Sequence, residues 1–220
     1  MSLIYFTPGP SQLYPTYATH LQEAMQLQLG SVNHRSQTFR DIYAHTDTML
    51  RQLMGIPAGY SIYFAASATE IWEKILLNLV EKRSHHLVYG AFSKRFYEFA
   101  QLLQKEPSIT RAEDGQGFLT NSILVPDDTE LLCITQNETA TGAYMPGESL
   151  VQLRRNVPQA LHCADLVSCA PCVPLSIDAM DAVFFSVQKA FGMPPGLGVW
   201  IANEACMDKA RFIKKQGRMI

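Results

Sequence analysis

Short apolar runs alternate with stretches of helical periodicity along most of this chain. The runs SIYFAA, HLVYG, ELLCIT, LHCAD, AVFFS and LGVWIA have the length and composition of strands, and a shorter one lies near Ile109. Apolar residues return at helical spacing in 69–80, 93–103 and 204–215, and more weakly in 148–155. Strands separated by helices form βαβ units, whose parallel sheet is covered on both faces. The sequence therefore predicts a three-layer α/β/α domain with a mostly parallel sheet.

The first part of the chain has a different pattern. FTPGPSQLYP is rich in Gly and Pro, which predicts an extended arm over residues 1–20. THLQEAMQLQL and FRDIYAHTDTMLRQLMGI then predict two helices. In the second helix we expect a buried stripe of Ile42, Met49, Leu50, Leu53 and Met54. Residues 21–220 are expected to form one large domain.

Composition excludes several classes of partner. The chain has 220 residues, of which 47% are hydrophobic, and its 18 basic and 20 acidic residues give a pI near 6.3. This balance predicts no binding to nucleic acid or to an anionic membrane. The sequence has neither an apolar run near the roughly 20 residues of a membrane span nor the pattern of a secretory signal. A cytoplasmic location is the expectation.

The five cysteines predict reduced thiols rather than a disulfide framework. Cys169 and Cys172 in CAPC have the spacing of a redox or half-zinc site, and His162 and Cys163 are neighbours. No second CxxC accompanies CAPC, so a structural or incidental role is favoured over a metal site. A thiol or zinc module built on these cysteines remains the weakest of the alternatives.

Chemically useful side chains follow the apolar runs. The SATE turn, Phe92, QNET, Asp165 and Lys189 each come at or just after the end of a predicted strand. Ligands of open parallel sheets bind outside the carboxyl ends of the strands, so these groups are expected to meet in one crevice.

Lys189 and Asp165 suggest a particular chemistry for that crevice. A partly desolvated lysine amine forms Schiff bases with carbonyl compounds. An aspartate can hold a proton on the ring nitrogen of pyridoxal phosphate, which needs it to act as an electron sink. The SATE turn suits a phosphate at a helix N-terminus, yet Ser67 and Glu70 fit an ordinary capping box equally well. Both interpretations stay open here.

Taken together, these motifs resemble a known family. FTPGP, NHRSQTF, SATE, TQNETATG, ADLVS and SVQKAFGMPPGLGV occur in an order and at separations similar to the phosphoserine aminotransferase branch of the class V aminotransferases. The resemblance runs from Thr7 to Val199. It implies the pyridoxal-phosphate transferase fold (fold type I), pyridoxal 5'-phosphate as cofactor, and amino transfer from a small amino acid to a 2-oxo acid. It also implies a homodimer with shared active sites, and an N-terminal arm near the site.

The resemblance assigns roles residue by residue. Lys189 would attach the cofactor and shuttle a proton, Asp165 would pair with its ring nitrogen, and Phe92 would stack on the ring. The remaining expected cofactor contacts are Thr139, Ala68, Thr69, Gln188 and Ser168, and the expected substrate contacts are His34 and Arg35. No metal ligand is expected.

The chain departs from the family pattern at two points. Thr69 stands where phosphoserine aminotransferases resemble one another in having an arginine for the substrate phosphate, and MPPG is similar to the alanine–glyoxylate side of the class. The family's small C-terminal domain is also expected to be largely missing. An alanine- or serine–glyoxylate aminotransferase, and a truncated cofactor-binding module without turnover, are therefore alternatives. A lyase or desulfurase of the same fold is less favoured, because Gln188 stands where those enzymes usually have histidine.

Overall fold

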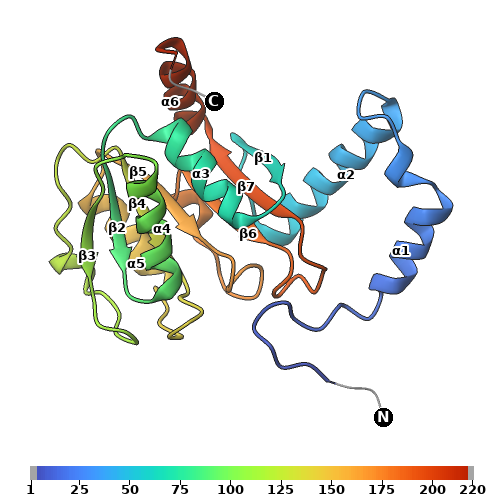
Figure 1. Cartoon of the computed structure of the whole chain (residues 1–220), viewed down its shortest axis with the longest axis horizontal. Coiled ribbons are helices and arrows are strands. Elements are labelled where there is room, and N and C mark those ends of the chain that lie inside the picture. Colours follow the sequence, from blue (N-terminus) through green and yellow to red (C-terminus); the bar gives the residue numbers. More distant parts are fainter. Residues whose placement is uncertain (1–3, 218–220) are drawn as a thin grey trace.

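A seven-stranded sheet runs through the middle of the computed structural model, which describes residues 4–217 (Figure 1). Its strands are β1 (Tyr60–Ala65), β2 (Ser84–Val88), β3 (Ser108–Arg111), β4 (Leu131–Thr135), β5 (Leu161–Asp165), β6 (Ala182–Ser186) and β7 (Gly198–Asn203). They lie in the order β1-β7-β6-β5-β4-β2-β3. Strand β7 runs antiparallel to both of its neighbours, and the other pairs are parallel. The prediction of a mostly parallel sheet is confirmed.

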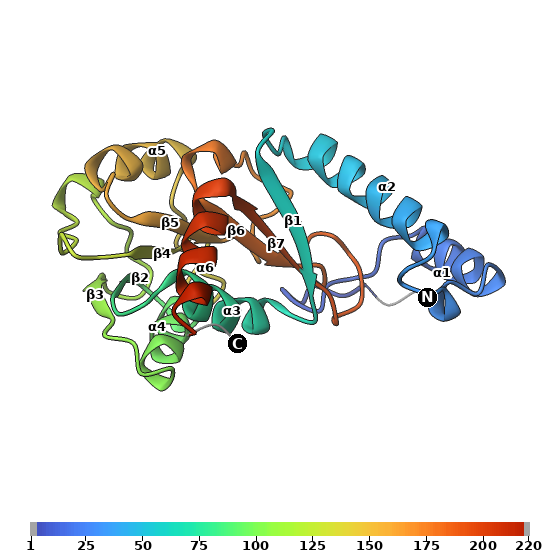
Figure 2. The ribbon, with the colours of Figure 1, turned by 90° about the horizontal axis from the view of Figure 1, so that it is seen from above.

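Helices cover both faces of the sheet, as Figure 2 shows. On one face lie α3 (Ala68–Leu79), α4 (Ala91–Leu102) and α6 (Glu204–Lys215), and on the other lies α5 (Gly147–Asn156). The other helices are α1 (Tyr17–Gln26), α2 (Gln37–Met54) and the short 3₁₀ turns Leu29–Ser31, Thr120–Ser122 and Ile177–Ala179. The predicted three layers are confirmed. None of the helices within 4–217 is both long and apolar enough to cross a bilayer.

The central strands are apolar on both sides because both faces are covered. In β4, Leu131 and Cys133 face the core beneath α3, α4 and α6, whereas Leu132 and Ile134 face the core beneath α5. All four side chains are almost fully buried. This is the pattern of a parallel strand between two helical layers, and it explains why the sequence shows a continuous apolar run rather than an alternating one.

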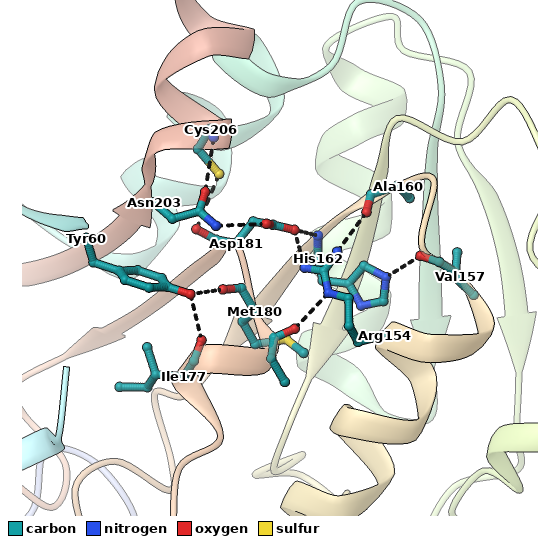
Figure 3. Close-up of polar contacts among 11 residues, drawn as sticks. Tyr60, Arg154, Val157, Ala160, His162, Ile177, Met180, Asp181, Asn203 and Cys206 are labelled. Carbon is teal, nitrogen blue, oxygen red and sulfur yellow. Dashed lines mark hydrogen bonds and ion pairs between the residues drawn. The ribbon is translucent and has the colours of Figure 1, made fainter. Parts of the chain in front are cut away.

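A polar network ties the layers together at the edge where β5 and β6 begin (Figure 3). The carboxylate of Asp181 pairs with the guanidinium of Arg154 on α5. It also accepts hydrogen bonds from the backbone N–H of His162 at 2.7 Å and from the side-chain amide of Asn203 at 2.9 Å. Asn203 in turn caps α6, because its Oδ1 accepts the N–H of Cys206. One carboxylate therefore links α5, two strands and α6.

Helices α1 and α2 lie beyond β1, to one side of the sheet, in both views (Figures 1 and 2). The predicted helices are present, but the predicted burial of the α2 stripe holds only at its C-terminal end, where Met54 is buried and Leu50 is partly buried. Met54 is its only buried residue among those described, whereas Ile42, Met49 and Leu53 are between 39% and 60% exposed. The reason is geometric, since only the C-terminal end of α2 reaches the core of the domain. Ile42, Met49 and Leu53 therefore form an exposed apolar face on α2.

The N-terminal arm is shorter than the predicted range 1–20. Helix α1 begins at Tyr17, and residues 1–3 lie outside the described part of the chain. Residues before α1 run as extended chain toward the edge of the sheet at which β6 ends, where Ser11 binds the loop after that strand.

Candidate functional site

A cavity of about 320 Å³ lies at the carboxyl ends of the strands. The loops after β1, β2, β4, β5 and β6 all contribute to it, as does the N-terminal arm. Its lining includes Ser67, Ala68, Thr69, Trp72, Phe92, Asn137, Thr139, Asp165, Gln188, Lys189, Gly9 and Pro10. The expectation that the strand-end groups meet in one crevice therefore agrees with the geometry.

Lys189 is held from two sides inside this cavity. Its Nζ donates a hydrogen bond to Oγ1 of Thr139 at 2.7 Å and lies 5.1 Å from the centre of the Phe92 ring. Burial lowers the pKa of the Lys189 amine, against the opposing effects of Asp165, Glu138 and Cys169. A lower pKa leaves more of the amine neutral near pH 7, which is the form that attacks a carbonyl carbon.

Asp165 ends β5 and is only 4% exposed. Its Oδ1 accepts the backbone N–H of Val167 at 2.9 Å. Burial raises the pKa of this carboxyl to about 6, although the Val167 hydrogen bond, Lys189 and Trp72 all act to lower it. The indole N–H of Trp72 is buried and does not reach hydrogen-bond geometry with any described residue. The cavity thus holds a carboxylate that is costly to ionise unless a cationic group binds beside it.

The first turn of α3 forms the end of the cavity nearest β1. Oγ of Ser67 caps the helix by accepting the N–H of Glu70, and the N–H of Ala68 donates to Oγ of Ser186 at 2.9 Å. In a capping box the Glu70 carboxylate would accept the N–H of the N-cap residue, Ser67. Here it accepts the N–H of Ala66, one residue earlier. Within residues 4–217 the N–H of Thr69 has no such partner.

The turn also needs a glycine on the neighbouring strand. A Cβ at Gly198 would lie 2.7 Å from the backbone carbon of Ser67, so only glycine lets β7 approach the turn this closely. The cap accepts the Glu70 N–H and leaves the Thr69 N–H unused, so capping by Ser67 and the expected role of this turn as an anion site are compatible.

The N-terminal arm crosses the loop that carries Lys189. The N–H of Ser11 donates to the carbonyl of Gln188 at 2.8 Å, and its hydroxyl donates to the carbonyl of Lys189. Gly9 lies against the lysine stem, where an added Cβ would come within 3.0 Å of the Lys189 Cγ. The arm therefore fixes the backbone of the lysine loop and closes one side of the cavity.

Three of the expected site residues do not line the cavity. Ser168 lies behind it, where its hydroxyl donates to the carbonyl of Asn137 and accepts the Asn137 side-chain amide at 2.8 Å. His34 and Arg35 are exposed in the segment before α2. Their expected contact with substrate remains a prediction.

Two residues of the site were not singled out from the sequence. Asn137 lines the cavity, and Glu138 is completely buried beside it. Both belong to the QNET motif that follows β4, so their position at a strand end was the available signal.

Cys169 and Cys172 occupy a tight turn after β5, with Cys169 buried and Cys172 exposed. Both thiols are free. Over residues 4–217, no group of three or more His, Cys, Asp or Glu side chains is arranged to hold a metal ion.

The cost of ionising Asp165 gives a stability prediction for the chain without ligand. The folded-state pKa of about 6 exceeds the ordinary value of 3.8, so folding is opposed once pH rises through this interval, and the full cost is present above about pH 6. Asp165→Asn is expected to raise the free energy of unfolding by about 1–3 kcal/mol at pH 8.

Thermal melts at pH 8 and near pH 4 check this expectation. The gain should vanish at the lower pH, where the wild-type carboxyl is protonated in the folded chain. Asp127→Asn, at an exposed position outside the cavity, serves as the control. Equal melting temperatures of wild type and Asp165→Asn at pH 8 would contradict the assignment.

Comparison with known proteins identifies a family and several relatives of this chain. The family model for class V aminotransferases matches residues 4–220. A curated phosphoserine aminotransferase from Corynebacterium glutamicum is 28% identical over 218 residues, which cover 98% of this chain and 56% of that protein. The chain therefore spans a little over half the length of this relative.

Solved structures agree. The crystal structure of a phosphoserine aminotransferase from Cytophaga hutchinsonii matches with a TM-score of 0.95 and 45% identity, covering 98% of this chain and 60% of the other. The ureidoglycine–glyoxylate aminotransferase of Bacillus subtilis matches with a TM-score of 0.80 and 22% identity, over 94% of this chain and 54% of its own length, which is a likeness of fold alone.

Proposed function

The chain belongs to the class V aminotransferase family, and on this premise we propose that its cavity binds pyridoxal 5'-phosphate for amino transfer from a small amino acid to a 2-oxo acid. The observation that carries the proposal is that a partly desolvated Lys189 amine and the buried Asp165 carboxylate line the same cavity. Phosphoserine is the amino donor we favour, because relatives named phosphoserine aminotransferases match nearly the whole chain.

The residues present fit this cofactor. The Thr69 N–H at the start of α3, which has no partner in the described part of the chain, suits its phosphate, and the Phe92 ring suits one face of its pyridine ring. Asp165 suits a protonated ring nitrogen, since a cation beside the carboxylate removes the cost of its ionisation. When bound, the cofactor supplies an electron sink for the carbon that bears the amino group.

Side chains of the protein would attach the cofactor, transfer the proton and orient the reacting groups. Lys189 Nζ would hold the cofactor covalently and, once the substrate's amino group has displaced it, would carry the proton of the substrate's α-carbon to the carbon of the cofactor's aldehyde. Thr139 Oγ1 fixes the position of Nζ, and Asp165 keeps the ring nitrogen protonated. The arm closes the cavity around Lys189 and limits the access of water.

A donor panel tests the proposal. The chain mixed with pyridoxal phosphate is expected to develop a visible absorbance band, which phosphoserine should bleach and a 2-oxo acid should restore. Alanine, serine and glutamate are the competing donors, and bleaching by alanine or serine instead of phosphoserine would favour the glyoxylate-type alternative. A band that no donor bleaches would favour a binding module without turnover. Absence of a band would refute the proposal.

A homodimer is part of the proposal. The exposed apolar face of α2, together with the exposed pair His34 and Arg35 that precedes it, supports a second copy as the partner. Sedimentation of the cofactor-loaded chain decides this point, and a monomer would contradict it. The expected cytoplasmic location also stays a prediction.

A further inference from the structure

Glu138 is a buried acidic residue without a role in the chemistry proposed above. Its side chain is 0% exposed and lies under the first turn of α4, next to the cavity but outside its lining. A buried carboxylate is costly unless its oxygens are fully hydrogen-bonded. The partners of this carboxylate therefore indicate what it is for.

All of these partners are hydrogen-bond donors. Oε1 accepts the backbone N–H groups of Phe92 and Ala140, each at 3.2 Å. Oε2 accepts the N–H of Ser93 at 2.9 Å and its hydroxyl at 2.8 Å. A carboxylate is the side-chain group that accepts at both ends, whereas a glutamine would turn an N–H₂ group toward one pair of donors.

The bonds join two segments that carry site residues. Phe92 and Ser93 start α4 after β2, whereas Ala140 follows Thr139 in the loop after β4. Phe92 and Thr139 are the two groups that hold the Lys189 amine. Fixing both segments to one carboxylate therefore fixes the two contacts of Lys189 relative to each other.

Gly90 makes room for this arrangement. A Cβ at position 90 would lie 2.2 Å from Cγ and 2.6 Å from Cδ of Glu138. No side chain can occupy that place while Glu138 stays under the helix. The position of the Glu138 side chain therefore depends on the glycine at position 90.

We infer that Glu138 is a positioning residue that clamps the first turn of α4 to the loop after β4, and so sets Phe92 and Thr139 around the Lys189 amine. That this arrangement serves the binding of pyridoxal phosphate rests on the proposed function. The clamp itself is a property of the chain without cofactor and can be measured there.

Amide hydrogen exchange of the cofactor-free chain tests the clamp. In Glu138→Ala, exchange at Phe92, Ser93 and Ala140 is expected to rise by roughly 10- to 100-fold, because hydrogen bonds to a charged acceptor are lost. Gly90→Ala should reproduce this result by displacing the intact glutamate, and Glu138→Gln should give a smaller rise. Glu98→Gln, at a partly exposed position on the same helix, is the matched control. Unchanged exchange in Glu138→Gln and Gly90→Ala would overturn the inference even if Glu138→Ala fails to fold.

The pH dependence of Lys189 labelling by acetic anhydride tests whether Glu138 acts on the Lys189 amine or only caps α4. Asp165, Glu138 and Cys169 are the groups that raise the pKa of Lys189 against its burial, so removing the Glu138 charge should shift the labelling profile to lower pH. The dissociation constant of pyridoxal phosphate should rise at least about tenfold in Glu138→Ala. If exchange rises but neither labelling nor affinity changes, Glu138 is only a helix cap. If wild type binds no cofactor, the proposed function fails while the labelling comparison still decides the clamp.

Discussion

Replacing Lys189 with alanine is expected to abolish the visible absorbance band that pyridoxal phosphate produces with the wild-type chain. The amine is the group in the cavity that can bond covalently to an aldehyde, and burial keeps its pKa below the ordinary value. Loss of its proton transfer alone should lower any amino-transfer rate by roughly 10²- to 10⁴-fold. Absorbance titration, followed by borohydride trapping and mass spectrometry of the peptide that contains residue 189, makes the measurement.

The control for this variant is Lys94→Ala, because Lys94 is exposed on α4 and does not line the cavity. It should keep the band. The fold of Lys189→Ala should persist, since among residues 4–217 the amine donates a hydrogen bond only to Thr139 at the cavity wall. A band of wild-type intensity in a folded Lys189→Ala protein would refute covalent attachment at this residue.

The second large effect concerns stability rather than chemistry. Asp181→Ala is expected to lower the free energy of unfolding by about 2–4 kcal/mol, because it leaves the partly buried Arg154 charge and the amides of His162 and Asn203 without their acceptor. That is a large share of the roughly 5–15 kcal/mol typical of a folded domain. Urea denaturation followed by far-UV circular dichroism measures it.

Asp208→Ala provides the matched comparison, because Asp208 pairs with Arg211 at an exposed site on α6, where an ion pair contributes little to stability. The Asp181 network lies at the opposite edge of the sheet from the cavity, so the folded fraction of Asp181→Ala should bind cofactor as wild type does. Equal denaturation midpoints for the two variants would show that the network contributes no more than a surface pair.

The strand-end residues could be placed from sequence because parallel topology leaves little choice. Once β5 and β6 are recognised as buried strands, Asp165 and Lys189 must emerge at the same edge, and the side chains there converge on one cavity. The bounds of β5, β6 and α6 were predictable for a related reason. Continuous apolar runs with polar residues at both ends define strands well, and α6 begins at a capping asparagine.

Helical periodicity could not say what covers α2. It shows that one face is apolar, but Ile42 and Leu53 look the same in sequence whether the covering surface belongs to this chain or to a second copy. Glu138 was missed for another reason. A glutamate in a loop is usually solvated, and three of its four donor groups belong to Phe92 and Ser93, more than forty positions earlier, so only the folded chain shows the carboxylate as buried and fully bonded.

The arm that crosses the Lys189 loop has a consequence for biosynthesis. Ser11 and Lys189 are 178 positions apart, so the ribosome makes the cover of the cavity long before the loop that it covers. At ordinary elongation rates the interval is roughly 10–35 s. Over that time the nascent arm has no docking surface, and a completed cavity can appear only after β6 has been translated. Premature termination anywhere before that strand would release a polypeptide that lacks Lys189 and the loop that the arm covers.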